Sequence, residues 1–137
     1  MQSHAYVAIV TCLALLVYFW MVLGVGGARR KSGITAPAMI GDPHLERAVR
    51  VQANTLEWLP IFLPSLWLCH LFWQQEDQTG IIVSAIGAMW ILGRIVYALG
   101  YVREPSKRSL GFLIQFAASI VLLMGALGKA VMVVIAA

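Results

Sequence analysis

Two stripes of polar and charged residues stand out in a sequence that is otherwise strongly apolar. The first stripe has spacings of four, four and three and consists of Glu46, Arg50, Asn54 and Glu57. The second has spacings of three, four and seven and consists of Arg94, Tyr97, Tyr101 and Arg108. Residues three or four apart share one face of an α-helix, so each stripe predicts one polar helix face.

The residue types of the two stripes suit a small ligand that carries both carboxylates and an amine. Guanidinium groups bind carboxylates bidentately, and a buried glutamate binds an ammonium group. Arginines are in excess here, because Arg29, Arg30, Arg50, Arg94, Arg103 and Arg108 face only Glu46, Glu57 and Glu104. A structural alternative assigns the charges to two ion pairs, Glu57 with Arg94 and Glu46 with Arg50. That alternative leaves the amide, the phenols and Arg108 without a role, and we therefore favour a site for a small zwitterionic peptide.

The elements that carry the stripes are predicted to cross a membrane. The chain has 137 residues, of which 61% are hydrophobic and only 12% are charged, whereas soluble domains have about 25% charged residues. This composition excludes a disordered chain, a disulfide scaffold and a nucleic-acid-binding surface. We predict an all-α membrane protein, a four-transmembrane-helix bundle forming a single domain over 1–137, with helices at about 5–28, 43–73, 80–102 and 109–135.

The basic residues between these helices predict the orientation of the bundle. The connections 29–53 and 103–109 carry almost all of them, whereas the connection 74–79 and the N-terminus carry no Lys or Arg. The positive-inside rule places the basic connections in the cytoplasm and both termini outside it. Asp42 and Pro43 predict the start of the second helix, as cap and first-turn residue. The two polar stripes then lie at matching depth, near the cytoplasmic ends of their helices.

Two segments resemble signatures of the MAPEG family, the membrane-associated proteins in eicosanoid and glutathione metabolism. They are Glu46-Arg47-Ala48-Val49-Arg50-Val51-Gln52-Ala53-Asn54-Thr55-Leu56-Glu57 and Gly93-Arg94-Ile95-Val96-Tyr97-Ala98-Leu99-Gly100-Tyr101. The similarity covers essentially the whole chain and is greatest to microsomal glutathione transferases of the leukotriene C4 synthase type. It implies a homotrimer with glutathione bound between neighbouring subunits, near the cytoplasmic face.

The resemblance also implies roles for individual residues. Contacts to glutathione are expected from Arg29, Arg50, Gln52, Asn54, Glu57, Arg94, Tyr97 and Tyr101, with Gln52 reaching the neighbouring site. Arg108 is the candidate for activating the thiol, and Arg30 is the second. Because the loop after Tyr101 has its own spacing, Lys107 and Arg103 remain alternatives. Trp58 stands where the leukotriene synthase has a tyrosine, so a phenolic contact is lost or replaced by stacking.

The function that these expectations favour is conjugation of the glutathione thiolate to lipophilic electrophiles from the bilayer, with possible reduction of lipid hydroperoxides. A non-catalytic lipid-binding scaffold of the same fold is the alternative, and a transporter gated by an Arg94–Glu57 pair is a weaker one. No metal is expected, since the three histidines lack metal-ligand spacing. A multi-pass protein of a bacterial inner membrane fits the short loops. Lys129, late in the last helix, should extend to the outer surface.

Several glycines within the predicted spans are expected to permit close helix approach rather than to bind phosphate. They are Gly24, Gly26, Gly27, Gly87, Gly93, Gly125 and Gly128.

Overall fold

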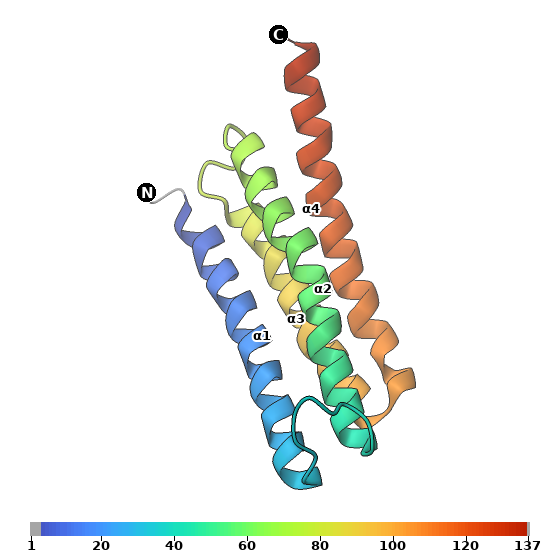
Figure 1. Ribbon diagram of the computed structural model, residues 1–137. Coiled ribbons are helices and arrows are strands. Elements are labelled where there is room, and N and C mark those ends of the chain that lie inside the picture. Colours follow the sequence, from blue (N-terminus) through green and yellow to red (C-terminus); the bar gives the residue numbers. More distant parts are fainter. Residues whose placement is uncertain (1–3, 137) are drawn as a thin grey trace.

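Four long helices make up most of the computed structural model, which describes residues 4–136 (Figure 1). They are α1 (Ala5–Ser32), α2 (Pro43–Phe72), α3 (Ile81–Arg103) and α4 (Ser109–Ile135), and a short 3₁₀ turn, η2 (Pro105–Arg108), precedes α4. All four are long and apolar enough to cross a membrane. The residues described contain no strand. The predicted all-α, four-helix membrane fold is therefore confirmed.

The local sequence explains where α1 ends and α2 begins. The α1 helix runs to Ser32 rather than to the predicted residue 28, and its last turn holds the cations Arg29, Arg30 and Lys31. Cations are favourable at this end because the helix dipole is negative there. Gly33, with φ of 72°, then ends the helix. As predicted, the Asp42 carboxylate accepts a hydrogen bond from Leu45 N (2.8 Å), and α2 begins at Pro43.

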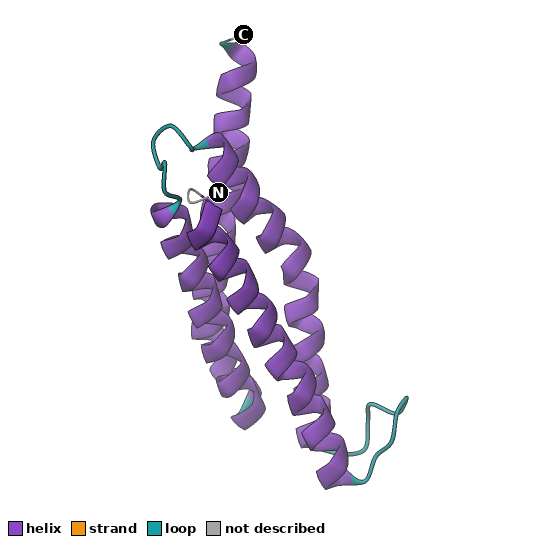
Figure 2. Ribbon diagram, turned by 90° about the vertical axis from the view of Figure 1, so that its left-hand side faces the viewer, coloured by secondary structure: helices purple, strands orange, loops and turns teal. Residues whose placement is uncertain are grey.

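The helices are arranged so that α2 and α3 lie between α1 and α4 (Figures 1 and 2). The α1–α2 connection and η2 lie together at one end of the bundle, here called the basic end. Both termini and the α2–α3 connection lie toward the opposite end, here called the far end. The two basic connections thus share one end of the bundle, as the sequence predicted.

Close contact between α3 and α4 depends on glycines that face each other. A Cβ on Gly93 would lie 2.6 Å from Gln115 N, and a Cβ on Gly111 would collide with the backbone nitrogen of Tyr97. Small residues are the usual means of close packing in lipid, where the hydrophobic effect does not drive helices together. The prediction for Gly93 is therefore confirmed. A Cβ on Gly24, Gly26, Gly27 or Gly128 would meet open space, so the packing of the described helices within one chain does not test the prediction for them.

Candidate functional site

The polar stripes of α2 and α3 meet inside the bundle, toward the basic end. The fully buried Arg94 donates a hydrogen bond from Nη1 to Asn54 Oδ1 (3.1 Å) and another from Nη2 to Thr55 Oγ1. Its guanidinium also lies 4.3 Å from the centre of the Tyr97 ring. The matching depth of the two stripes is thereby confirmed.

Arg94 supports the site from behind, because it is fully buried and does not line the cleft that opens beside Asn54 and Tyr97. Its two hydrogen bonds fix the Asn54 amide on α2, while the contact with the Tyr97 ring ties α3 to the same place. A planar guanidinium suits this task better than an ammonium group, since it donates in fixed directions and stacks on aromatic rings.

A cleft of about 270 Å³ opens in front of these residues, and we call it the polar cleft. Its lining comes from α2, α3, η2 and α4 and consists of Arg50, Asn54, Tyr97, Arg108 and Phe112. The contact between Gly111 and the Tyr97 backbone brings the start of α4 against α3, and so places Arg108 and Phe112 beside the tyrosine. Four of the five lining residues are polar, although the helices that carry them are mostly apolar.

Arg108 stands where it can act on an anion. It immediately precedes the first residue of α4, and its guanidinium lies 5.4 Å from the centre of the Tyr101 ring. The Tyr101 ring in turn lies 5.6 Å from that of Tyr97. Within residues 4–136, no carboxylate forms a salt bridge with Arg108. The guanidinium and the positive end of the α4 dipole therefore both favour a negative charge in the cleft.

The other basic residues near η2 are placed differently. Lys107 forms a salt bridge with Glu104 (3.1 Å), and Ser106 Oγ donates to the same carboxylate (2.7 Å). These two contacts lower the pKa of Glu104, the Ser106 hydroxyl first, so the carboxylate stays charged and balances Lys107. Arg103 lines a separate cleft, between α1 and α3. Of the three alternatives for activating a thiol, the geometry therefore favours Arg108.

Glu57 at the edge of the polar cleft is paired with Arg50 rather than with Arg94. The Arg50 Nη1 to Glu57 Oε1 distance is 3.3 Å, and the side chains are 51% and 56% exposed. Asn54 Nδ2 donates to Glu57 Oε2 (3.3 Å). The structural alternative, which paired Glu57 with Arg94 and Glu46 with Arg50, does not match the structure, because Glu57 is paired with Arg50 and Arg94 donates to Thr55 instead. The transporter gate that required the Arg94–Glu57 pair loses its basis.

Glu46 has a local role instead. Its carboxylate accepts a hydrogen bond from Gly41 N (3.0 Å) and so ties the loop to the first turn of α2. Although it shares the polar face of α2, it does not line the polar cleft.

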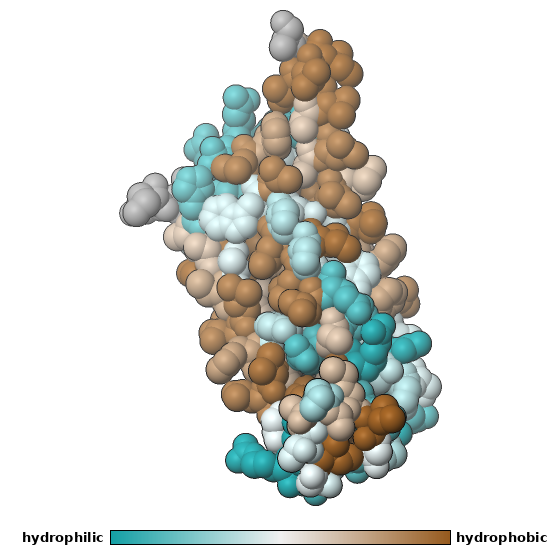
Figure 3. All heavy atoms as spheres, in the orientation of Figure 1, coloured by the Kyte–Doolittle hydropathy of each residue, from teal (hydrophilic) through white to brown (hydrophobic). Residues whose placement is uncertain are grey.

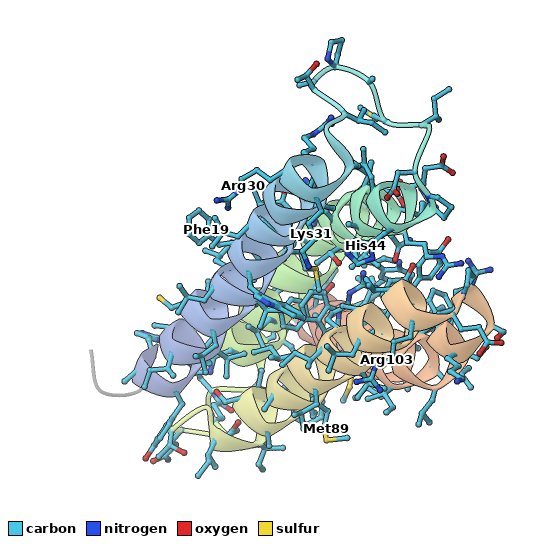
Figure 4. The ribbon with its side chains drawn as sticks, turned by 90° about the horizontal axis from the view of Figure 1, so that it is seen from below. Phe19, Arg30, Lys31, His44, Met89 and Arg103 are labelled. Carbon is cyan, nitrogen blue, oxygen red and sulfur yellow. The ribbon has the colours of Figure 1, made fainter. Side chains whose placement is uncertain are left out.

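Six predicted site residues do not line the polar cleft of their own chain: Arg94 lies behind it, Glu57 at its edge and Tyr101 beside Arg108, while the other three lie further away. Arg29 donates to the carbonyl of Ala38 (2.6 Å) in the α1–α2 loop, and Gln52 donates to the Tyr18 hydroxyl (2.8 Å) on α1. Arg30 projects from α1 on the side of the bundle away from α4 (Figure 4). These residues therefore belong to the α1 side of the chain, whereas the cleft lies where α2, α3 and α4 meet.

Sequence reasoning missed Thr55, Phe112 and Gly111, each of which shapes the cleft. The signal for Thr55 was weak, since a threonine within a helix usually bonds its own backbone, as Thr55 also does to Val51 O (2.8 Å). Trp58 stacks edge to face on Phe112 and Phe116, with ring centres 5.9 and 6.0 Å apart. The Trp58 ring therefore packs against α4.

Comparison with known proteins identifies the family of this chain. The MAPEG family model matches residues 7–128. The chain belongs to the MAPEG family. It is 35% identical to human microsomal glutathione S-transferase 2 over 124 residues, covering 90% of this chain and 81% of the relative. Rat leukotriene C4 synthase is 33% identical, with 78% and 68% of the two chains covered. An uncharacterized protein of the cyanobacterium Synechocystis is 45% identical, with 88% and 84% covered.

Membership of the MAPEG family agrees with the resemblance found in the two helical signatures. The matched range includes every residue that lines the polar cleft, all of α2 and α3, and most of α1 and α4. The protein is thus an integral, multi-pass membrane protein of this family.

Proposed function

We propose that the protein is a membrane-bound glutathione transferase, which conjugates the thiolate of glutathione to lipophilic electrophiles. The observation that carries the proposal is the polar cleft, in which Arg50, Asn54, Tyr97 and Arg108 converge from different elements. The names of the human and rat relatives, a glutathione S-transferase and a leukotriene C4 synthase, support the same reading.

The charges around the cleft fit a tripeptide with two carboxylates and one ammonium group. Arg50 is half exposed and can exchange its contact with Glu57 for a ligand carboxylate. Glu57 would then be available to the ligand ammonium, with the Asn54 amide holding it in place. The phenol of Tyr97 supplies a further hydrogen-bonding group in the lining.

Arg108 is the group that we assign to activation of the thiol. A free thiol has a pKa of about 8.5, and only its thiolate is a good nucleophile. A guanidinium beside the sulfur favours the anion, and lowering the pKa by about two units requires about 2.7 kcal/mol of differential stabilisation. The S–H proton leaves to solvent, a carbon–sulfur bond forms, and the leaving group departs with its electron pair, as chloride does from an aryl chloride.

We further propose that the working form is a homotrimer in which a neighbouring copy completes each site. Glu57 is 56% exposed near the middle of the membrane-spanning helix α2, where contact of a charged group with lipid is costly. Figure 3 shows a hydrophilic area that extends from the basic end into the apolar part of the surface. Arg29, Arg30 and Gln52 lie on the α1 side, so they would reach a polar cleft only from a second copy.

The lipophilic substrate would enter from the bilayer, because the cleft opens on a surface that is otherwise apolar. Lipid hydroperoxides are a second substrate class, reduced to alcohols while two glutathiones are oxidised to the disulfide with release of water. For orientation we propose the basic end in the cytoplasm and both termini outside. A bacterial inner membrane is the proposed location, and the Synechocystis relative supports it.

Thermal unfolding and turnover of the purified protein in detergent test this proposal together. Glutathione should raise the melting temperature, and chlorodinitrobenzene should be conjugated in a glutathione-dependent reaction. S-methylglutathione is the matched control, since it keeps the charged groups, should stabilise the protein and cannot react. Stabilisation without turnover of any electrophile or hydroperoxide would favour a non-catalytic binding protein. Absence of both effects would contradict the proposal.

A further inference from the structure

A second cleft lies on other faces of α2 and α3 than those used by the polar cleft. It has a volume of about 230 Å³, and α1, α2 and α3 all contribute to its lining, with Gly24, Val51 and Ala98 among the contributors. We call it the α1–α3 cleft. It shares no lining residue with the polar cleft. The proposed transferase chemistry therefore makes no use of it.

The α1–α3 cleft continues as an apolar groove along the surface of the same two helices. An adjoining hollow of about 410 Å³ shares Trp20 and Leu99 with the cleft and extends along α1 to Leu13. The eleven residue steps from Gly24 to Leu13 correspond to about 16 Å of helix. One leaflet contributes about 15 Å of hydrocarbon. The groove is therefore as long as one leaflet is deep, which suits a single acyl chain.

Basic side chains surround the mouth of the cleft at the basic end. His44, from the first turn of α2, and Arg103, from the last turn of α3, belong to the lining. Figure 4 looks at this end and shows them with Lys31, from the last turn of α1. No acidic residue lines the cleft, and within the described residues none of the three forms a salt bridge. An anionic group is the complement of such a mouth.

We propose that the α1–α3 cleft binds an anionic phospholipid from the leaflet at the basic end. One acyl chain lies in the groove between α1 and α3, and the headgroup phosphate is held by Arg103, with His44 and Lys31 beside it. Basic pockets between transmembrane helices recognise anionic headgroups in this way. The apolar groove and the basic mouth make separable contributions to binding. The groove binds the acyl chain, and the mouth selects a negatively charged headgroup.

Gly24 allows the groove to be filled without disturbing the helices. It lines the cleft, yet a Cβ at this position would have no atom within 4 Å. Gly24→Leu therefore puts a side chain into the space assigned to the lipid. Gly26→Leu is the matched control, because Gly26 lies on the same helix, also has open space around it and does not line the cleft.

Native mass spectrometry of the detergent-purified protein measures lipid retention directly. The probes are phosphatidylglycerol and phosphatidylcholine with the same acyl chains. The wild type should retain the anionic lipid at least about five-fold better, the effect of roughly one basic side chain. Gly24→Leu should lose most retention of phosphatidylglycerol, and Gly26→Leu should behave as the wild type.

Substitution at the mouth tests the charge separately. Arg103→Gln should weaken phosphatidylglycerol retention about five-fold and phosphatidylcholine retention less, because the choline cation already offsets the phosphate charge that Arg103 binds. Lys107→Gln removes the same charge outside the cleft, where Glu104 already balances it, and should have little effect. Equal retention of the two lipids by the wild type, or unchanged retention in Gly24→Leu, would overturn the proposal.

A labelling experiment on the wild type makes the test independent of any variant. Phosphatidylglycerol with a photoreactive group on one acyl chain should cross-link within 13–24 of α1 or 91–103 of α3. Cross-links confined to other segments would place the lipid elsewhere and overturn the proposal.

Discussion

The two ends of the bundle both contain charged and polar side chains, but they use them differently. At the far end these groups satisfy one another. Lys129 forms a salt bridge with Glu76, and the buried Asp77 accepts hydrogen bonds from Ile82 N and Val83 N (both 3.1 Å) at the start of α3. At the basic end, Arg108 faces an open cleft with no carboxylate partner within residues 4–136.

This difference separates charges that serve the fold from charges that are held ready for a ligand. Lys129 was expected to reach the surface, and it does so against Glu76 and over the Trp73 ring, 5.2 Å from its centre. The two charges of this pair balance each other, so neither is left for a ligand. Arg108 has been brought beside Tyr101 and the start of α4 without receiving a counter-charge, which leaves its interaction with an anion available.

The largest effect should come from the helix contact that builds the cleft. Gly111→Ala places a methyl group against the Tyr97 backbone and should lower stability by about 1–3 kcal/mol, the usual cost of overpacking. Gly128→Ala, on the same helix toward the far end, meets open space and should be neutral or slightly stabilising, by up to about 1 kcal/mol. Thermal and denaturant unfolding in detergent compare the two. Equal stabilities would show that the close approach is not needed.

Removal of the unpaired guanidinium should have the next largest effect. Arg108→Gln should lower turnover of chlorodinitrobenzene about 25-fold at neutral pH, the loss of thiolate when a thiol pKa returns from about 6.5 to about 8.5. Activity of the variant should recover as the pH rises, because deprotonation by solvent replaces the lost stabilisation. Lys107→Gln should retain activity. If Lys107→Gln lowered turnover as much as Arg108→Gln does, the assignment of thiol activation to Arg108 would be contradicted.

A smaller effect is expected from the residue behind the cleft. Arg94→Lys cannot donate to Asn54 and Thr55 together, so the amide loses its fixed orientation. The KM for glutathione should rise about ten-fold, equivalent to a hydrogen bond to a charged group, while kcat changes little. Arg103→Lys, at the end of the same helix and outside the polar cleft, should leave the KM unchanged. A fall in kcat alone would contradict a positioning role for Arg94.

The smallest effect should come from the far end. The Lys129 ammonium lowers the pKa of Glu76 below its ordinary value. The pair therefore stabilises the fold above the pKa that Glu76 has in the unfolded chain, and this contribution is lost as the pH falls through the lower, folded-state value. Lys129→Gln should slightly lower the melting temperature at neutral pH and not in acid, with turnover unchanged. A loss of activity would remove the contrast between the two ends.

The sequence was sufficient to predict the helices, because long apolar segments separated by short polar ones leave few other folds in a membrane. It also predicted that the stripes around Asn54 and Arg94 would meet, since an antiparallel hairpin brings equal depths together. The end of α1 was missed by one turn, because the basic residues after residue 28 were read as loop rather than as favourable last-turn cations.

The partners within the site could not be predicted in the same way. Helical spacing gives the face and depth of a side chain, but not which of several neighbours it contacts. Arg94 bonds Thr55, whereas the structural alternative had paired it with Glu57. The role of Gly111 depends on the distance between two helices. The spacing of residues within one helix does not predict that distance. The roles of Arg29, Arg30 and Gln52 stay predictions that require a second copy of the chain.

The most direct measurement is the ultraviolet thiolate absorption of glutathione bound to the detergent-purified protein, followed as a function of pH. The account predicts that the wild-type complex holds the thiolate at neutral pH, with a pKa about two units below that of the free thiol. In Arg108→Gln the bound thiol should titrate close to its free value. An unshifted pKa in the wild-type complex, or the same shift in both proteins, would contradict the account.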